Sequence, residues 1–422
     1  MKTSKDKGFQ SAFLLLFNDL KFYNHMISNR AKELSSSQTL KITAKAKELA
    51  RQGVSVISLS AGEPDFKTAP HICNAAIEAI TEGFHGYTMN TGMPELREAV
   101  AAKLKRENKL DYQPYEIILS NGAKQSIGFA LLATINPKDE VLIPAPYWVS
   151  YPEMVKMADG TPVTIKTTFA NNYKLTPKQL KESITRKTKG LILCSPSNPT
   201  GACYTKNELK ELADVLSEHP DIIIFSDEIY EYITFEGDHV SILNVAPALK
   251  DRTILVNGFS KGFAMTGWRL GYAAGPKPVI DAIAKIQSQE TSAPSSISQK
   301  AGIAAYTGSM KQVSDMRQAF KERRNFLVNE LRSIEGVDCF VPSGAFYIFP
   351  DISRFLGKKT PDGDKIKTST DLCIYLLEKH GLATVPGDAF GEPGGLRISY
   401  AASMENLKEG MIRLKNGLSS LS

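Results

Sequence analysis

Short apolar segments recur through the middle of the chain, and helical stretches separate many of them. A strand buried on both faces appears in a sequence as a continuous apolar run, because neither side of it meets water. Strands joined by crossover helices form a mainly parallel sheet with helices on both faces. The sequence therefore predicts an α/β fold, with strands at 117–119, 141–143, 191–193, 222–225, 254–256 and 270–273, and with helices at 43–51, 94–106 and 125–134.

The length of the chain predicts more than one domain. Its 422 residues exceed what a single hydrophobic core usually supports. We expect a large domain at 73–310 and a smaller α+β domain built from both chain ends, at 26–72 and 311–422. A long amphipathic helix at 310–333 would lead into the second part of this smaller domain, with strands at 54–59, 345–349 and 396–400.

Residues 1–25 differ from the rest of the chain. They carry basic charge and a short apolar run at 12–17, which Asp19 ends. No small-residue cleavage site follows, so we interpret this segment as a dispensable extension rather than a signal peptide. No apolar run in the chain approaches the roughly 20 residues of a membrane helix, and we expect no contact with a membrane.

The composition narrows the class of protein. Apolar residues make up 42% and charged residues 23%, as in soluble globular enzymes. The net charge of +6 comes with dispersed lysines, which does not favour a nucleic-acid-binding surface. The five cysteines include no close C-x-x-C pair, and the six histidines have no metal-ligand spacing. We therefore expect reduced thiols in a cytoplasmic protein, and no metal site.

Polar or glycine-rich clusters follow five of the predicted strands. In open α/β sheets, ligands bind outside the carboxyl ends of the strands. One such cluster means little, but five at the same end of a sheet would converge on one crevice. The clusters lie at 121–124, 146–148, 195–199, 227–230 and 260–261.

Lys261 and Asp227 are the two most informative residues in these clusters. Lys261 lies among small and apolar residues, which lower the pKa of a lysine and leave a neutral amine able to attack a carbonyl. An isolated S-K-G segment is more often a surface turn. Asp227 ends an apolar strand and suits a buried carboxylate that keeps a cofactor's ring nitrogen protonated, although it suits a helix N-cap equally well.

The other clusters fit the remaining groups of one cofactor, pyridoxal 5'-phosphate. Asn198 and Tyr230 can donate hydrogen bonds to its phenolic oxygen, although Asn198 also suits a turn. Ala123 and Lys124 open a helix whose exposed amide groups attract a phosphate. Arg269 would add a bidentate contact to this phosphate, and Ser260 a hydroxyl. Trp148 offers a flat face to stack on the ring, or is a core residue.

Eight segments also resemble a known family. They are SLSAGEPDF, GYTMNTGMPELREAV, PAPYWVSYPEMV, SPSNPTGACY, SDEIYE, NGFSKGFAMTGWRLGYAAGP, PSGAFYIFPDI and PGDAFGEPGGLRISYA. The resemblance is to the class I and II aminotransferases of fold type I. It is strongest to the bacterial and plant aspartate aminotransferase branch, which includes aspartate/prephenate aminotransferases, and it runs from about Met26 to the C-terminus.

The resemblance implies a role for each matching position. Lys261 matches the Schiff-base lysine that moves a proton between the substrate Cα and the cofactor C4′. Arg397 matches the arginine that holds the substrate α-carboxylate, and Gly62 a backbone contact to the substrate. Tyr87 matches a tyrosine that reaches the phosphate in the neighbouring subunit of a homodimer. The matching cofactor contacts are Asp227, Asn198, Tyr230, Trp148 and Arg269.

Two positions depart from the family pattern. Many relatives carry a phosphate-binding serine three residues before the lysine, where this chain has Gly258. Dicarboxylate-specific relatives in the animal and enteric branch use a partner-subunit arginine for the distal carboxylate, and the matching region 286–292 has none. In the branch that this chain resembles, a lysine at Lys124 is linked to acidic substrates, and Lys124 with Thr39 to prephenate.

The resemblance thus implies an aminotransferase that moves an amino group between aspartate and 2-oxoglutarate in a ping-pong reaction, with prephenate as a further substrate. Another fold-type-I enzyme would share the cofactor residues: an aromatic or alanine aminotransferase, or a carbon-sulfur lyase. A regulator with an aminotransferase-like domain is a different class, and the segment before Met26 is too short for its DNA-binding domain. A purely structural subunit would have been suggested by loss of Lys261 or Asp227.

Overall fold

The structure is a computed structural model that describes residues 26–35 and 38–422. The chain divides into two units, at 1–36 and 37–422. In the first unit, helix α2 (Asn29–Glu33) begins after Ser28, whose side chain accepts a hydrogen bond from the Ala31 amide. The extension predicted at 1–25 lies outside the described residues. Everything below concerns the second unit.

A seven-stranded sheet forms the centre of this unit, in the order β2-β8-β7-β6-β5-β3-β4. Neighbouring strands from β7 to β4 are parallel, whereas β8 is antiparallel to both β2 and β7. The predicted α/β fold with a mainly parallel sheet is therefore confirmed. The strands are β2 (Ile117–Ser120), β3 (Glu140–Ala145), β4 (Thr161–Lys166), β5 (Thr188–Cys194), β6 (Ile223–Asp227), β7 (Thr253–Gly258) and β8 (Gly271–Ala274).

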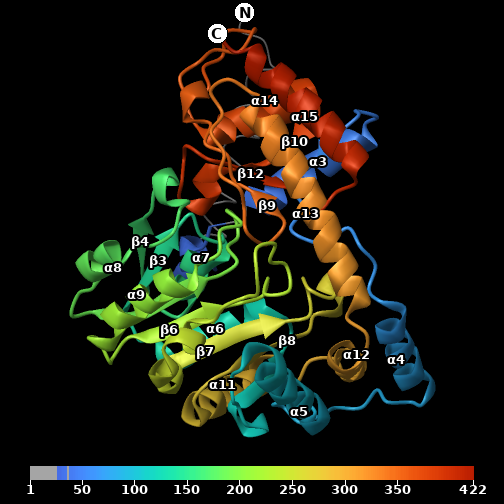
Figure 1. The fold of residues 1–422 in the computed structure, drawn as a ribbon, viewed down its shortest axis with the longest axis vertical. Coiled ribbons are helices and arrows are strands. Elements are labelled where there is room, and N and C mark those ends of the chain that lie inside the picture. Colours follow the sequence, from blue (N-terminus) through green and yellow to red (C-terminus); the bar gives the residue numbers. More distant parts are fainter. Residues whose placement is uncertain (1–25, 36–37) are drawn as a thin grey trace, which may run out of the picture. The chain divides into compact units, whose positions relative to one another are not determined.

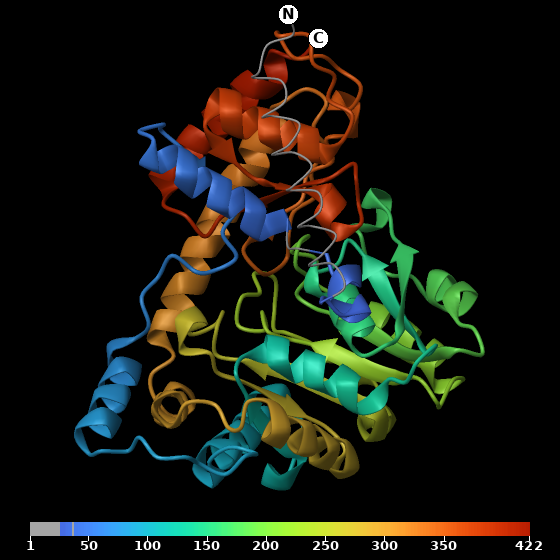
Figure 2. The ribbon, with the colours of Figure 1, turned by 180° about the vertical axis from the view of Figure 1, so that it is seen from behind.

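Helices cover both faces of this sheet, because successive side chains of each strand point in opposite directions. In β5, Leu191 and Leu193 belong to one hydrophobic cluster, while Ile192 belongs to another. Figures 1 and 2 show the sheet between its helices. The helices around the sheet are α5 (Pro94–Lys103), α6 (Ala123–Thr134), α7 (Ser150–Met157), α8 (Pro177–Ser183), α9 (Lys206–Ser217), α10 (Ile242–Val245), α11 (Lys277–Glu290) and α12 (Ser296–Thr307). Helix α4 (Pro70–Thr81) lies farther from the strands and packs against α12.

Segments from the beginning and the end of the second unit build a smaller layer next to the sheet. Strand β1 (Ile57–Ser58) pairs in parallel with β10 (Leu382–Ala383), and β11 (Val385–Pro386), β12 (Leu396–Ser399) and β9 (Tyr347–Ile348) form an antiparallel sheet. The long helix α13, predicted at 310–333, rises from the larger part to this layer (Figure 1). The helices here are α3 (Gln38–Arg51), α13 (Lys311–Arg332), α14 (Ser369–His380) and α15 (Met404–Ser419).

The pairing of β1 with β10 supports a smaller domain made from both chain ends, although its boundaries stay a prediction. Strand β1 is shorter than the strand predicted at 54–59, since Val54 is exposed.

Strand β4 is not among the predicted strands. It lies at the sheet edge, where only Ile165 is buried, so its sequence lacks an apolar run. Within the described residues, no helix is long and apolar enough to cross a membrane.

Candidate active site

The strand directions bring the five polar clusters to one edge of the sheet. Strands β2, β3, β5, β6 and β7 run in the same direction, so their carboxyl ends lie together. Strand β6 ends at Asp227, and β7 ends three residues before Lys261. The helix predicted from Gln125 begins two residues earlier, at Ala123, directly after Gly122.

Lys261 is half-buried, and its amine faces polar and aromatic groups from three parts of the chain. Its Nζ donates a hydrogen bond to the Gly62 carbonyl and lies 5.9 Å from the centroid of the Tyr230 ring. The pKa of Lys261 is lowered to about 8, mainly by burial; the charge of Glu63 opposes this shift and the positive charge of Arg397 adds to it. A lysine with this pKa provides neutral amine near neutral pH.

Asp227 is buried, and within the described structure its carboxylate accepts only two hydrogen bonds. It accepts one from the Tyr151 hydroxyl at 2.6 Å and one from the Ile229 amide at 3.2 Å. Burial raises the pKa of this carboxyl to about 6, and the neighbouring charge of Glu228 adds to the effect. The segment after Asp227 is a turn rather than a helix, so the alternative of a helix N-cap is wrong.

Arg397 lies in β12 and is buried between two aromatic rings. Its Nη1 donates to Asn198 Oδ1 at 3.1 Å, and its Nη2 to the Ser60 carbonyl at 2.8 Å. The guanidinium carbon lies 4.5 Å from the centroid of the Tyr347 ring and 5.1 Å from that of Phe390. Among the described residues, its Nε has no hydrogen-bond partner. A buried cation with a free N–H is suited to binding a carboxylate.

An anion site forms where α6 begins. Gly122 has φ +86°, and a side chain there would lie 2.7 Å from Nη2 of Arg269. The Arg269 guanidinium donates to the carbonyls of Thr266 at 2.9 Å and Asn121 at 3.0 Å. The amino end of a twelve-residue helix and a guanidinium thus lie side by side, as phosphate binding requires. Ser260 is buried nearby on the loop after β7.

The glycine at 258 has a physical reason. A Cβ there would lie 2.8 Å from the Gly271 Cα and 3.0 Å from the Leu270 carbonyl, so no side chain fits without moving β8. A serine at this position would therefore strain the packing of β7 against β8, and Ser260 is a hydroxyl that the loop offers instead.

The tryptophan and lysine predicted at the substrate side are in contact. Lys124 Nζ lies 5.0 Å from the centroid of the Trp148 ring, and burial together with Arg269 lowers its pKa. Trp148 meets Tyr151 edge to face at 5.4 Å. Tyr87 is fully exposed and makes no part of these contacts in the described structure. The side chain of Thr39, in α3, lies outside what the structure describes.

Several residues of the site were not predicted from the sequence. The Tyr151 hydroxyl donates a hydrogen bond to Asp227. Tyr151 lies three residues after Trp148, in the segment that follows β3, and this nearness to a predicted site residue could have indicated it. The Tyr347 hydroxyl lies 2.9 Å from that of Tyr230, and its ring covers Arg397. Tyr347 lies within an apolar strand, which gives no sign of a role in a site.

The fold and these contacts define a class of protein. A mainly parallel sheet that presents a lysine of lowered pKa and a buried carboxylate beside an anion site is the arrangement of a fold-type-I enzyme dependent on pyridoxal phosphate. The profile of the family Aminotransferase class I and II matches residues 54–414. The chain belongs to this family, and pyridoxal phosphate is its cofactor.

Individual relatives cover nearly all of the chain. A Petunia hybrida protein, the bifunctional aspartate aminotransferase and glutamate/aspartate-prephenate aminotransferase, is 51% identical over 93% of this chain and 82% of its own. The crystal structure of the Rhizobium meliloti aspartate aminotransferase matches with a TM-score of 0.91 and 45% identity, over 94% of this chain and 99% of that one. The Thermus thermophilus aspartate aminotransferase with maleate matches with a TM-score of 0.87 and 42% identity, over 93% and 99%.

The residues present fit the cofactor. Buried Asp227 accepts only two hydrogen bonds within the described structure, which leaves its carboxylate able to accept a third from a ring N–H. The glycine at 122 leaves the space beside Arg269 open, so an anion can approach the backbone. Each charged group of the cofactor therefore has a complementary group at this edge of the sheet.

Proposed function

We propose that the protein moves an amino group between L-aspartate and 2-oxoglutarate, giving oxaloacetate and L-glutamate in a ping-pong reaction. The observation that carries this proposal is the meeting of Lys261, Asp227 and Arg397 at one edge of the sheet, close enough for the charges of the other two to act on the lysine. The names of the Petunia hybrida and Rhizobium meliloti proteins, both aspartate aminotransferases, support aspartate as the amino donor.

The amino acid is held by its α-carboxylate on Arg397. The guanidinium is fixed by Asn198 and Ser60, so it offers its remaining N–H groups without losing side-chain freedom when the substrate binds. The rings of Tyr347 and Phe390 exclude water from this contact and strengthen it. Every amino acid and 2-oxo acid in the reaction carries the carboxylate that Arg397 recognises.

Seven residues would hold pyridoxal phosphate. Bound there, it supplies an aldehyde for the amino group and a ring that withdraws electrons from the substrate Cα. Asp227 pairs with the ring nitrogen and keeps it protonated. The other six are Trp148 on the ring face, Asn198 and Tyr230 at the phenolic oxygen, and Ala123, Ser260 and Arg269 at the phosphate.

Lys261 is the proton carrier. Its pKa of about 8 leaves neutral amine at physiological pH, so it can accept the proton from the substrate Cα and return it at C4′. The Gly62 carbonyl holds the amine in the free protein, which keeps Nζ at the edge of the sheet. In the second half-reaction the same amine moves the proton in the opposite direction, because both halves pass through the same groups.

Lys124 is the candidate for the substrate's far carboxylate. Its amine lies against the face of Trp148, next to the ring on which the cofactor would stack. Burial and the charge of Arg269 lower the pKa of Lys124, and the ammonium form of this side chain would favour acidic substrates. Prephenate, which also carries a second carboxylate, is a further candidate substrate, and Thr39 would join Lys124 in binding it.

The site would be completed by a second copy of the chain. Tyr87 lies a few residues after α4, and its side chain is fully exposed. An exposed hydroxyl is available to reach the phosphate site of a partner chain. A homodimer with two shared sites follows, and the isolated chain would be inactive.

The cysteines indicate the compartment. All five are free in the structure, which favours a reducing compartment such as the cytoplasm.

The enzyme class is tested with Lys261→Ala. This variant should lose nearly all turnover and the near-visible absorbance that the cofactor shows when joined to a lysine. Full activity would refute the assignment. Substrate choice is tested by a steady-state panel of amino donors and 2-oxo acids, including prephenate, on the wild type and Lys124→Ala. Lys358→Ala is the control, because Lys358 also lies against an aromatic ring, 5.4 Å from the Phe355 centroid, while its amine donates to the Leu421 carbonyl near the chain end.

The expected result is a raised KM for acidic substrates in Lys124→Ala alone. If aspartate is not among the best donors of the wild type, the aspartate proposal falls while the family stands. Shared sites are tested by mixing inactive Lys261→Ala with Tyr87→Phe. A mixed dimer would contain one site with both Lys261 and Tyr87, so tighter cofactor binding than in Tyr87→Phe alone is expected.

A further inference from the structure

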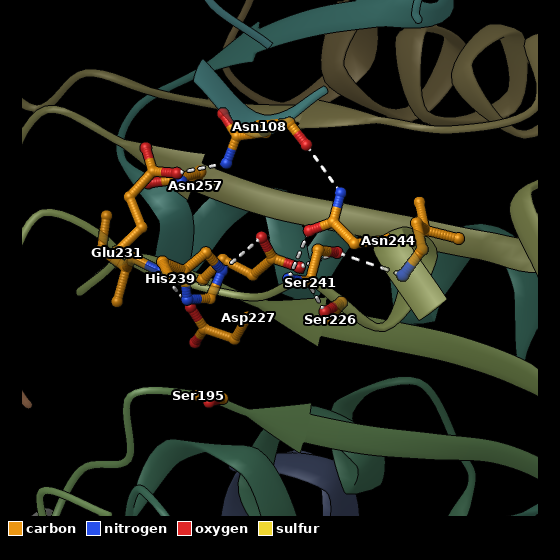
Figure 3. A network of polar contacts seen from close by, with 12 residues as sticks. Asn108, Ser195, Ser226, Asp227, Glu231, His239, Ser241, Asn244 and Asn257 are labelled. Carbon is orange, nitrogen blue, oxygen red and sulfur yellow. Dashed lines mark hydrogen bonds and ion pairs between the residues drawn. The ribbon is translucent and has the colours of Figure 1, made fainter. Parts of the chain in front are cut away.

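A buried polar network lies directly beside Asp227, and none of its members takes part in the reaction described above (Figure 3). Glu228, the next residue, is almost completely buried. Its carboxylate accepts hydrogen bonds from the hydroxyls of Ser226 at 2.8 Å and Ser241 at 2.6 Å. Its second oxygen lies 2.8 Å from Nε2 of His239. Both carboxylate oxygens of Glu228 therefore have hydrogen-bond partners within the network.

The network closes into a ring around the turn after β6. The Ser241 amide donates to Asn244, whose side chain donates to the Asn108 carbonyl at 2.6 Å. Asn108 in turn donates to the Glu231 carboxylate at 2.8 Å, and the Glu231 amide donates to the Glu228 carbonyl at 2.9 Å. A closed ring of hydrogen bonds has little freedom to relax, so it fixes the backbone between its two glutamates.

His239 supplies the charge that balances Glu228. Burial alone would lower the pKa of His239, but the Glu228 carboxylate raises it above its usual value. The other charged groups that act on His239 are Glu231, which favours its protonation, and Lys103, which opposes it. Lys103 is itself buried and paired with Glu231, so the two buried glutamates each have one cation.

We propose that His239 is a positioning residue for Asp227: through Glu228 it balances the negative charge beside Asp227 and fixes the turn that carries Asp227 and Tyr230. The inference rests on the proposed function, because it gives Asp227 and Tyr230 their roles toward the cofactor. It assigns a role to a histidine that touches neither cofactor nor substrate.

Electrostatics gives the proposal its direction. The charge of Glu228 disfavours the ionised form of the neighbouring Asp227 carboxyl. The His239 ring lies 2.8 Å from the Glu228 carboxylate, and in its protonated form it offsets that charge at close range, which favours the anion of Asp227 that the ring nitrogen needs. Removing one partner of a buried ion pair leaves an uncompensated charge, whereas replacing both partners with neutral groups is much less disruptive.

The experiment uses the purified apoprotein titrated with pyridoxal phosphate. Four variants are compared with the wild type: His239→Gln, Glu228→Gln, their double variant, and His380→Gln as the control. His380 also pairs its Nε2 with a side chain, the Tyr375 hydroxyl at 3.0 Å, but it ends α14 in the smaller layer. The readouts are the cofactor dissociation constant and the pH at which the absorbance of the bound cofactor titrates.

The charge argument predicts opposite effects for the two single variants. His239→Gln should weaken cofactor binding about tenfold and raise the pH of the spectral transition, because a negative charge is left beside Asp227. Glu228→Gln should lower that pH. The double variant should bind the cofactor within about twofold of the wild type, and His380→Gln should not differ from it.

Three results would overturn the proposal: His239→Gln that binds like His380→Gln, single variants that shift the spectrum in the same direction, or a double variant weaker than His239→Gln. Should His239→Gln fail to fold, which urea unfolding of the apoprotein detects, the downward shift in Glu228→Gln still decides the question. A wild type that binds no pyridoxal phosphate would instead refute the proposed function.

Discussion

Replacing Tyr151 with phenylalanine removes the single side-chain hydrogen bond that Asp227 accepts in the described structure, with almost no change in volume. The hydroxyl lies 2.6 Å from Asp227 Oδ2, and both groups are buried. The carboxylate would keep only the Ile229 amide at 3.2 Å. Because Asp227 has to be ionised to hold the cofactor's ring nitrogen, this hydrogen bond should matter for both stability and cofactor binding.

The magnitude follows from the pKa of Asp227. Burial raises that pKa from 3.8 to about 6, so at neutral pH the ionised carboxyl destabilises the folded apoprotein by about 3 kcal/mol relative to the unfolded chain, at about 1.4 kcal/mol per pH unit. A hydrogen bond to an ionised group contributes about 1.5–3 kcal/mol, against about 1 kcal/mol for a neutral one. Tyr151→Phe should therefore raise the pKa of Asp227 by about one more unit.

The pH dependence has a definite sign. Below about pH 4 the carboxyl is protonated in both the folded and unfolded chains, so ionisation contributes nothing. As the pH rises to about 6, the wild-type apoprotein loses stability, because the unfolded chain ionises more easily. In Tyr151→Phe this loss continues to about pH 7, so the stability gap to the wild type widens by about 1–2 kcal/mol.

Urea unfolding of both apoproteins at about pH 5 and about pH 8 measures this gap. Tyr204→Phe is the control, because the hydroxyl of the partly buried Tyr204 accepts its hydrogen bond from the Leu175 amide at 2.9 Å rather than meeting a carboxylate. Its stability difference should not change with pH. A gap between wild type and Tyr151→Phe that stays constant or narrows with rising pH would refute the reasoning.

Three further predictions concern the same site. Asp227→Asn should stabilise the apoprotein above about pH 6, because the variant lacks the buried charge that the wild type carries there, while turnover falls sharply. Urea unfolding and steady-state rates check these two effects, and unchanged stability would contradict the pKa argument. Arg397→Lys should raise KM for amino acids roughly 10–100-fold with the cofactor spectrum unchanged, because one ammonium cannot replace a guanidinium that already uses two nitrogens. Gly258→Ser should cost about 1–3 kcal/mol of unfolding free energy, whereas Gly267→Ser, with open space around it, should cost far less.

The sequence predicted the sheet well because strands buried on both faces leave continuous apolar runs. Strand β4 was missed because it lies at the edge of the sheet with one buried residue, and such a strand leaves no continuous apolar run. The sequence also predicted that the polar clusters meet at one edge, because parallel strands share a direction. The start of α6 at Ala123 was two residues off, since Gly122 turns the chain directly into the helix.

The contacts between clusters were beyond the sequence. Tyr151 and Asp227 are 76 residues apart, and either could have belonged to the core. His239 follows no pattern that marks a functional histidine, and its partner Glu228 is visible only as one more carboxylate after a strand. The role of Thr39 and the domain boundaries stay predictions.

The sequence by itself determined the chemistry available at the edge of the sheet, because each strand and the polar cluster after it are contiguous in the chain. Asp227 ends a strand, and Lys261 and the start of α6 each lie three residues after one. Only the tertiary structure decided how these groups act on one another. Arg397 reaches Asn198, and Lys261 reaches Gly62, each across 199 residues of chain. The local sequence predicts that Lys261 and Asp227 are buried, but the distances to the charged groups and hydrogen-bond donors around them arise from packing between such distant segments.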